Sequence, residues 1–452
     1  MKTYAIIMAA GLGTRMKSDV PKCAYNLLNK PMIQYIVETL EASKVDEIIT
    51  VVGHKREIIE DILQDRSKYA FQEKQIGTAN AVMAAKDLVV EEGQTIILPG
   101  DTPLIDVDII NKLLSTHKKN KNDFTIGTIE LEDPTSFGRI IRSNNNIVKI
   151  VEHKDATDSE LQINEINTGV FCIENKLLFD TLKEVKNENA KNEYYLTDIV
   201  ELAANLNKKI GSFTIEDTYK LTGINDLYTL SKIENSLRKA VNKRHMLNGV
   251  NIINPETVTI SPESVIGAGT IINQGSILLG NNVIGKNVVI GPNTELDHAK
   301  LEDGVLCRHS VISHSTVKAN TTVGPFAHIR LNSVIGKNDR IGNFVEVKNS
   351  IIGNKTNAAH LAYIGDTDCG DNVNFGCGSI TVNYDGKNKH RTTIGNGVFL
   401  GCNSNLIAPI SVESDSYIAA GSTITNTVES GDMAIARSTQ VNKKNYAGKY
   451  KK

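Results

Sequence analysis

Residues 260–296 decide the fold of the second half of the chain: ISPESVIGAGTIINQGSILLGNNVIGKNVVIGPNTEL. An isoleucine or leucine returns at every sixth position, at Ile260, Ile266, Ile272, Leu278, Ile284, Ile290 and Leu296. A six-residue period fits neither the 3.6-residue turn of a helix nor the two-residue alternation of a strand. It is the hexapeptide signature of a β-solenoid, in which one aliphatic side chain of each short strand points inward.

The same period continues, with phase slips, almost to the end of the chain. The further inward positions it predicts are Val305, Val311, Val317, Val323, Ile329, Ile335, Ile341 and Val347, then Ile352, Ala358, Ile364, Cys369, Phe375 and Thr381, and finally Ile394, Leu400, Leu406, Val412, Ile418 and Ile424. We therefore expect a left-handed parallel β-helix over 251–437, followed by a Lys-rich tail at 438–452. The segment 382–393, VNYDGKNKHRTT, interrupts the period and is expected to leave the coil as a loop.

The first half has a different texture. Apolar runs at 4–10, 47–52, 95–98 and 123–128 alternate with helical spacing, as at 32–43, which predicts a mostly parallel, Rossmann-like α/β sheet over 1–228. Between the halves, apolar residues recur every three or four positions over 226–248, so 229–250 is expected to be a linker helix. Asn225 stands where its N-cap would lie and Gly249 where its C-cap glycine would lie.

Composition narrows the class of protein. The net charge is −2, aromatic residues make up 5 % of 452 residues, and tryptophan is absent, which gives no reason to expect nucleic acid as a partner. No apolar stretch approaches the 18 or so residues of a membrane-spanning helix. The six cysteines form no CxxC pair, a usage that fits a reducing cytoplasm.

The segment 8–22, MAAGLGTRMKSDVPK, directly follows the first apolar strand. It lacks the third glycine of GxGxxG, because Met16 stands there, and it also lacks GxxxxGK[ST]. Gly11 and Gly13 let backbone N–H groups approach phosphate oxygens, and Arg15 and Lys22 offset phosphate charge. This segment predicts a phosphate-binding loop.

This loop resembles the signature of the sugar-1-phosphate nucleotidyltransferases, and further motifs agree in order along the chain. They are FQEKQIGTANA at 71–81, PGDTPLI at 99–105, IVEHKDA at 150–156, EINTGVF at 165–171 and GIND at 223–226. Joined to a hexapeptide solenoid, they make the chain resemble the bifunctional N-acetylglucosamine-1-phosphate uridyltransferases/glucosamine-1-phosphate acetyltransferases. The resemblance implies a cytoplasmic enzyme that acetylates glucosamine-1-phosphate with acetyl-CoA. It then transfers uridylyl from UTP, giving UDP-N-acetylglucosamine for envelope polymers.

The resemblance implies one set of residues for uridylyl transfer. Gln72, Gly77 and Thr78 would hold uracil; Ala9, Ala10 and Gly11 would seat the nucleotide; Arg15 and Lys22 would contact phosphate; Gly138, Glu152 and Asn167 would contact the sugar; Asp101 and Asn225 would bind one or two Mg²⁺ ions. Oxygen ligands are those that Mg²⁺ prefers, and it needs only one or two from protein. Two structural readings stay open at this point: Asp101 as a turn residue and Asn225 as the helix N-cap.

A second set is implied for acetyl transfer. His360 would be the general base; Arg330 and Lys348 would clamp the phosphate; Tyr363, Asn374 and Asn383 would position the sugar; Asn383, Tyr384, Cys402, Ala420 and Arg437 would lie along acetyl-CoA. A histidine suits a base because its pKa lies near working pH. Leu331 departs from the family, which normally has proline there. The resemblance also implies a homotrimer whose acetyl-transfer sites draw on more than one subunit.

Two alternatives remain open from sequence. The solenoid could be only an oligomerisation or allosteric module, although such a module has no reason to carry His360, Tyr363 and the loop together. The chain could also be a non-catalytic sensor, a reading that Arg15, Lys22 and Asp101 disfavour.

Overall fold

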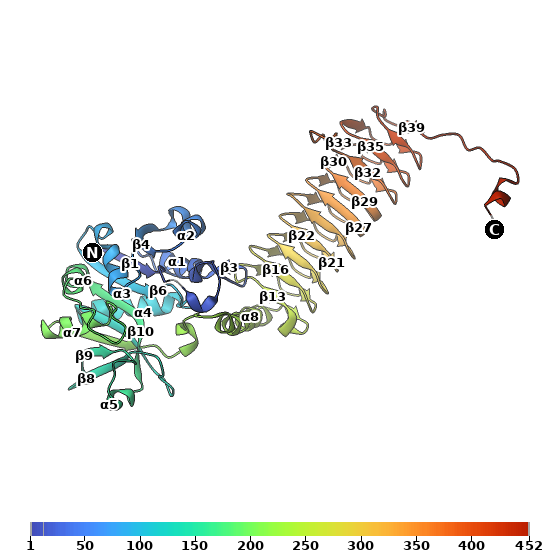
Figure 1. Ribbon diagram of the computed structural model, residues 1–452. Helices are drawn as coiled ribbons and strands as arrows, with labels where there is room; N and C mark the ends of the chain where they lie inside the picture. Colours follow the sequence, from blue (N-terminus) through green and yellow to red (C-terminus); the bar gives the residue numbers. More distant parts are fainter. Residues whose placement is uncertain (1, 12, 451–452) are drawn as a thin grey trace. The chain divides into compact units, whose positions relative to one another are not determined.

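The computed structural model describes residues 2–11 and 13–450. The chain forms two compact units, residues 1–235 and 236–452, which are described separately here (Figure 1).

The first unit is built on a mixed sheet with strand order β11-β7-β10-β6-β1-β4-β5. Its strands are β1 (Lys2–Met8), β4 (Glu47–Val52), β5 (Lys68–Phe71), β6 (Gly93–Pro99), β7 (Phe124–Glu130), β10 (Glu165–Glu174) and β11 (Ile210–Thr214). β1 pairs in parallel with β4 and β6, as the alternating pattern predicts. β10 runs antiparallel between β6 and β7, which the pattern did not indicate. The hairpin of β8 (Arg139–Ser143) and β9 (Asn146–Val151) extends from β10.

Helices cover both faces of this sheet because side chains of β1 alternate between two cores. Tyr4 and Ile6 pack into the core under α3, α6 and α7. Ala5 and Ile7 pack into the other core, under α1, α2 and α4. The helices are α1 (Met32–Ala42), α2 (Arg56–Leu63), α3 (Thr78–Ala84), α4 (Val107–Asn120), α5 (Asp158–Leu161), α6 (Asn175–Leu182) and α7 (Asp198–Asn205). Such a layered sheet leaves the carboxyl ends of its parallel strands open for ligands.

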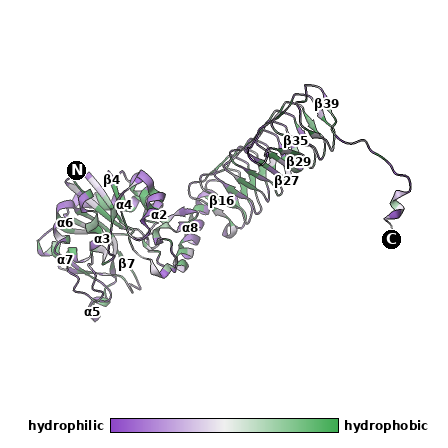
Figure 2. Cartoon of the chain, turned by 45° about the horizontal axis from the view of Figure 1, so that its top comes forward, coloured by the Kyte–Doolittle hydropathy of each residue, from purple (hydrophilic) through white to green (hydrophobic). Residues whose placement is uncertain are grey.

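The second unit contains stacked coils of short parallel strands, in one 19-stranded and one nine-stranded sheet. The 19-stranded sheet holds β12 (Asn251–Ile252), β13 (Thr259–Ile260), β15 (Ile271–Ile272), β16 (Ile277–Leu279), β18 (Val289–Ile290), β19 (Glu295–Asp297), β21 (Leu306–Cys307), β22 (Val311–Ser313), β24 (Thr322–Val323), β25 (His328–Arg330), β27 (Arg340–Lys348), β29 (Asn357–Gly365), β31 (Asn374–Phe375), β32 (Ile380–Val382), β34 (Phe399–Leu400), β35 (Asn405–Ile407), β37 (Tyr417–Ile418), β38 (Thr423–Ile424) and β39 (Met433–Ala434). The nine-stranded sheet holds β14 (Val265–Ile266), β17 (Val283–Ile284), β20 (Lys300–Leu301), β23 (Thr316–Val317), β26 (Val334–Ile335), β28 (Ile351–Ile352), β30 (Thr367–Cys369), β33 (Thr392–Ile394) and β36 (Ile410–Val412). Figure 2 shows hydrophobic residues recurring along these stacked strands.

The hexad predicts the inward positions with one error. Every predicted inward residue is buried except Val311, which is 37 % exposed, while its neighbour Ile312 is buried. The stacked inward positions around this point are Leu301, Cys307, Ile312 and Val317, so two steps are five residues instead of six. Val305 is buried, but it precedes the stacked position Cys307 by two residues. Each shortened corner removes one residue, so the inward positions after it shift by one relative to the count of six. A shift of one residue moves a side chain to the opposite face of its strand.

Residues 383–391 leave the coil as a loop, whereas Val382 and Thr392–Thr393, which the prediction had included, belong to β32 and β33. The pairing of β30 with β33 joins Thr367 to Thr392, so the loop is bypassed without breaking the ladder. Tyr384 and Lys389 form an antiparallel bridge within it.

The helix between the halves is α8 (Leu227–Leu247), and its N-cap differs from the sequence prediction. The side chain of Asp226, not that of Asn225, accepts the N–H of Thr229, at 2.7 Å. Gly249 has a φ of 87°, as expected for the glycine that ends a helix. Because Asp226 fills the cap, the side chain of Asn225 is available for another contact.

A carboxyl group inside the solenoid makes the stability of this unit depend on pH. Asp339 is 2 % exposed, and burial raises the pKa of its carboxyl from 3.8 to about 7. Oδ1 accepts the N–H of Thr356 at 2.8 Å, whereas Oδ2 has no hydrogen-bond partner. Between these two pKa values the folded state keeps a proton that the unfolded state has released, so stability falls as pH rises from about 4 to 7.

We expect Asp339→Asn to stabilise the protein at pH 8 and to change it little at pH 4. Asparagine keeps an acceptor for Thr356 and cannot ionise, which removes a destabilisation of about 1–2 kcal/mol after allowance for solvent screening. Thermal unfolding followed by circular dichroism at both pH values measures it. Asp303→Asn, at an exposed carboxylate that also accepts a backbone N–H, is the control. A variant that is less stable than wild type at both pH values would contradict the account.

Candidate active sites

The first site is a cavity of about 290 Å³ in the first unit, at the carboxyl ends of β1 and β6. The predicted residues among its lining are Ala10, Gly11, Lys22, Gln72, Gly77, Thr78 and Asp101. Gln75 and Glu193 also line it and were not singled out from the sequence. The motifs that are far apart in the chain therefore meet around one space.

Lys22 joins two residues of this site. Its ammonium lies 2.5 Å from Asp101 Oδ2 and 3.0 Å from Asn225 Oδ1. The backbone carbonyl of Asp101 accepts the N–H of Ile224 at 2.8 Å, which ties the end of β6 to the GIND segment. A carboxylate oxygen and an amide oxygen thus converge on one positive charge.

Local geometry explains the glycine and the polar residues at 72–78. Gly77 has a φ of 131°, and a Cβ there would lie 2.3 Å from the carbonyl oxygen of Tyr194, so only glycine fits. Gln72 is buried, and its Nε2 donates to the carbonyl of Gly77 and to Asn80 Oδ1 at 3.1 and 2.9 Å. These two hydrogen bonds hold the side-chain amide of Gln72, the group predicted to contact a base, in one position.

The three predicted sugar contacts form a neighbouring cluster outside the lining of that cavity. The N–H of Asn167 donates to the carbonyl of Gly138 at 2.9 Å, and a Cβ on Gly138 would lie 3.4 Å from Glu152 Oε1. Burial raises the pKa of Glu152, although the hydroxyl of Thr197 donates to its Oε1 at 3.2 Å and opposes the shift.

Three more predicted residues do not line the cavity: Ala9, Arg15 and Asn225, of which Asn225 contacts Lys22 as described above. The backbone N–H of Ala9 donates to the carbonyl of Val51 at 3.0 Å, which holds the loop against β4. Arg15 is exposed in the short 3-10 turn Thr14–Met16 and does not line the cavity.

The second site lies on a corner of the solenoid. A cavity of about 520 Å³ is lined by Leu331, Asn332, Lys348, Asn349, Asp366, Lys389, His390 and Arg391. The carboxylate of Asp366 makes three hydrogen bonds at this cavity. Its Oδ2 accepts from Lys348 Nζ at 2.9 Å and from the side-chain amide of Asn383, and its Oδ1 accepts from Asn349 Nδ2 at 2.5 Å.

Charges within this cluster set the protonation states. Burial acts to raise the pKa of Asp366, but Lys348 and the two amides outweigh it and lower that pKa. Burial acts to lower the pKa of Lys348, and the contact with Asp366 outweighs it and raises that pKa. Lys348 is therefore a fixed cation facing an open cavity.

Two further predicted residues flank this cluster. Nε and Nη2 of Arg330 donate to Glu346 Oε1 at 2.9 and 2.6 Å. The hydroxyl of Tyr363 accepts from Asn383 Nδ2 at 3.4 Å.

His360 and three of the predicted acetyl-CoA residues, Cys402, Ala420 and Arg437, lie at another corner. Four residues on successive coils have positive φ values: Leu361, Gly378, Asn403 and Gly421. The residues directly before them form a column along the solenoid, namely His360, Cys377, Cys402 and Ala420. Backbone bonds of 2.6–2.8 Å join these coils. Arg437 Nη1 donates to the carbonyl of Ala420 at 2.5 Å. His360 itself is exposed, and its Nδ1 lies 2.9 Å from Asn343 Oδ1.

The structure therefore divides the predicted acetyl-transfer residues between two corners. Along β29, the corner at Leu361 and the corner at Asp366 are separated by the face 362–365. His360 does not line the cavity of Lys348 and Asp366. Asn374 lies in β31, and the Tyr384 hydroxyl donates to the carbonyl of Gly386 at 2.7 Å within the loop; neither lines that cavity.

Sequence reasoning missed three polar partners that coil spacing could have found. Asp366 lies 18 residues after Lys348, and Asn343 lies 17 residues before His360, which in each case is one coil. Asn349, beside Lys348, completes the network around Asp366. Residues one coil apart stack directly, so a polar residue at that spacing from a candidate is a contact prediction.

Comparisons with known proteins agree with both halves. Residues 4–232 match the nucleotidyl transferase family, and residues 391–426 match the bacterial transferase hexapeptide (six repeats) family. The chain is therefore a nucleotidyltransferase joined to a hexapeptide-repeat β-helix, which confirms the predicted fold class.

Several relatives match this chain over nearly its full length. Bifunctional protein GlmU of Acholeplasma laidlawii is 51 % identical over 99 % of this chain and 97 % of its own. That of Thermoanaerobacter pseudethanolicus is 48 % identical over 98 % and 96 %, and that of Streptococcus mutans 44 % over 99 % and 98 %. The chain belongs to the family of bifunctional GlmU proteins. It is a uridylyltransferase and a glucosamine-1-phosphate acetyltransferase of UDP-N-acetylglucosamine synthesis, and a solenoid that serves only as a module is not favoured.

Likeness to a solved structure is weaker. A UDP-glucose pyrophosphorylase complexed with UDP-glucose covers 53 % of this chain and 100 % of its own, at 19 % identity and a TM-score of 0.44. Among residues 2–11 and 13–450, no helix is long and apolar enough to span a membrane.

Proposed function

We propose that the cavity at β1 and β6 binds UTP and N-acetylglucosamine-1-phosphate for uridylyl transfer. Gln72, Gly77 and Thr78 hold the uracil, while the glycine-rich loop and Arg15 lie along the phosphates. Gly138, Glu152 and Asn167 form the sugar side of the site. The observation that carries this proposal is the convergence of Lys22, Asp101 and Asn225, motifs from three distant segments, on one point.

That convergence also fits a Mg²⁺ ion. The ammonium of Lys22 stands between Asp101 Oδ2 and Asn225 Oδ1, so both oxygens already share a cation. Oxygen donors of this kind suit Mg²⁺, and Asp101 and Asn225 would hold the ion. When bound, it would neutralise charge on the phosphates. Lys22 would then face the same phosphates, where a second positive charge would offset the repulsion between two anionic substrates.

For acetyl transfer, we assign His360 as the base that removes a proton from the substrate amine. Asn343 Oδ1 accepts a hydrogen bond from Nδ1–H of His360, and this tautomer leaves the lone pair of Nε2 able to accept the proton of the amine. The amine nitrogen attacks the thioester carbon of acetyl-CoA, and CoA leaves as a thiol. Lys348 and Arg330 hold the sugar phosphate, with Asp366 keeping Lys348 in place.

The two corners imply that the acetyl-transfer site is completed between subunits. A stripe of exposed apolar side chains runs beside His360: Phe326 is 56 % exposed, Phe344 58 % and Leu361 58 %. The rings of Phe326 and Phe344 stack at 5.6 Å. Exposed aromatic residues in a row mark an interface. We propose that copies of this chain pack along this stripe in a homotrimer, bringing His360 of one subunit to Lys348 of the next.

Mixed trimers test this arrangement. Coexpression of His360→Ala with Lys348→Met should restore acetyl transfer to about one quarter of the wild-type rate, since random assembly of two variants gives that share of intact corner pairs. Coexpression of Lys348→Met with Arg330→Ala is the matched control. It should not restore acetyl transfer, because both substitutions lie in the same corner and every such corner then carries one of them. Equal failure of both mixtures, with trimers formed, would mean that one chain supplies the whole site.

We also place the enzyme in the cytoplasm, supported by its unpaired cysteines. The proposed division of labour is tested by measuring pyrophosphate and CoA release on one preparation. We expect both from the wild type, and each is silenced separately by the variants argued below.

A further inference from the structure

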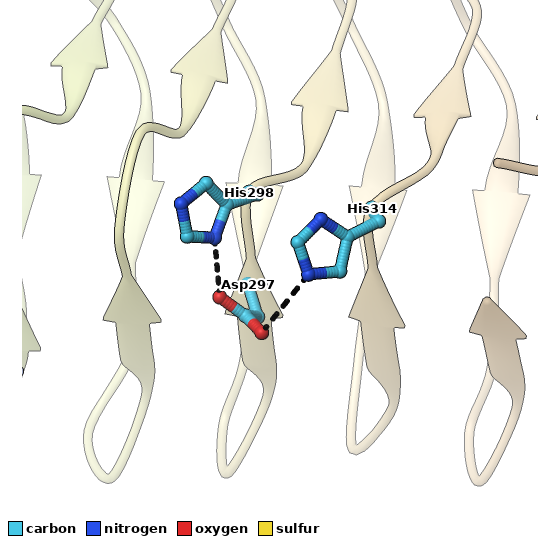
Figure 3. A group of neighbouring side chains, drawn as sticks. All are labelled: Asp297, His298 and His314. Carbon is cyan, nitrogen blue, oxygen red and sulfur yellow. Dashed lines mark hydrogen bonds and ion pairs between the residues drawn. The ribbon is translucent and has the colours of Figure 1, made fainter. Parts of the chain in front are cut away.

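Outside the lining of both cavities, one aspartate and two histidines meet on one corner of the solenoid (Figure 3). Nδ1 of His298 lies 2.7 Å from Asp297 Oδ1, and Nε2 of His314 lies 3.7 Å from Asp297 Oδ2. The three ligand atoms lie within 4.8 Å of one another. We infer that Asp297, His298 and His314 form a binding site for a divalent transition-metal ion of the Zn²⁺ class.

The coil geometry builds this arrangement. β19 and β22 pair so that Asp297 lies opposite Ser313, which places His298 and His314 at the same corner of successive coils. Both have left-handed backbones, with φ values of 49° and 46°, and their rings stack at 4.9 Å with planes 10° apart. On the preceding coil stands Gly280, where a Cβ would lie 2.2 Å from the His298 ring. The missing side chain leaves room for the imidazole.

The distances suit a small ion after side-chain rotation. Two ligands at about 2.1 Å from zinc at a tetrahedral angle are separated by about 3.4 Å. The two measured separations lie on either side of that value, and the rings are exposed on a rigid corner. Two histidines and one carboxylate favour zinc, cobalt or nickel over magnesium, which prefers an all-oxygen shell.

The site is separate from the acetyl-transfer cavity, although it lies on the same corner. The N–H of Asn332 donates to the carbonyl of His314 at 2.8 Å, and Asn332 lines that cavity, whereas Asp297, His298 and His314 do not. Three protein ligands leave coordination positions open to water or another donor. The proposal does not depend on the assignment of either catalytic site.

Direct metal binding tests it. The untagged full-length protein is stripped with chelator, saturated with Mg²⁺ to occupy oxygen-only sites, and titrated with Co²⁺ by visible absorption and with Zn²⁺ against a chromophoric chelator. We expect one ion per chain, with affinity falling at least about tenfold in both His298→Ala and His314→Ala. His309→Ala, which removes a histidine at another corner, and Cys402→Ser, which removes an exposed thiol, should leave binding unchanged.

Three outcomes would overturn the site: no Zn²⁺ bound by the wild type, binding that survives both changes, or equal loss in His309→Ala. Circular dichroism and pyrophosphate release are measured on every variant, so that unfolding is not mistaken for loss of a ligand. If the His298 and His314 variants lose their fold, Asp297→Asn, which keeps the shape of the side chain, must weaken binding for the site to stand.

Discussion

His360→Ala should lower CoA release by about 10²- to 10⁴-fold, the usual contribution of a general base, and leave pyrophosphate release at the wild-type rate. The loss follows because the amine must give up a proton as it attacks the thioester, and the Nε2 lone pair accepts it. The uridylyl side is spared because His360 belongs to the unit 236–452, whereas Lys22 and Asp101 belong to the unit 1–235. Both products are measured on the same preparation.

The matched control is His328→Ala, another exposed histidine on the solenoid, which should change neither rate. His360→Ala should also keep the wild-type melting temperature, because the side chain is exposed and its polar contact is to Asn343 on the neighbouring coil. A variant that retains a tenth or more of wild-type CoA release would remove His360 from the role of base. Loss of both activities together would mean that the change disturbs the whole chain.

The fold could be predicted from the sequence where a single repeat, the six-residue period, dominates. Most inward positions of the solenoid are occupied by a single aliphatic residue, so a count of six predicts burial along most of the second unit. The count failed at Val311 because a corner can shorten by one residue without a local signal in composition. In the first unit, alternating runs predict the layers, but the antiparallel insertion of β10 depends on long-range pairing, which local pattern does not encode.

The candidate sites were readable only in part. Lys22, Asp101 and Asn225 were each predicted from motifs, but their meeting point depends on the fold of 225 residues. Asp366 was missed because a lone aspartate after glycine reads as a turn residue. Its importance comes from Lys348, one coil earlier, and from Asn383 in the excursion loop. Residues that are neighbours in the structure but lie at unequal separations in the sequence form no single motif that would predict the site.

Asp101→Asn should lower pyrophosphate release by about 10²- to 10³-fold and leave CoA release unchanged. Asparagine keeps the shape of the side chain but removes the negative charge that faces Lys22 and would hold the metal. Its activity should recover in part at raised Mg²⁺, because a weakened ligand lowers affinity before it lowers the chemistry. Asp106→Asn is the control: Asp106 caps α4 and pairs with Lys220, so it should affect stability without this Mg²⁺ dependence.

The neighbouring pair Asn225 and Asp226 separates a metal ligand from a helix cap. Asp226 accepts the N–H of Thr229, so Asp226→Ala should lower the melting temperature and largely retain activity at saturating substrate. Asn225 faces Lys22 and Asp101 instead, so Asn225→Ala should keep the melting temperature and lose pyrophosphate release. The opposite result, in which Asn225→Ala lowers stability and Asp226→Ala lowers activity, would mean that Asn225 is the helix N-cap. It would also leave Asp101 as the single protein ligand of the proposed ion, since the amide oxygen would then be bound to the helix.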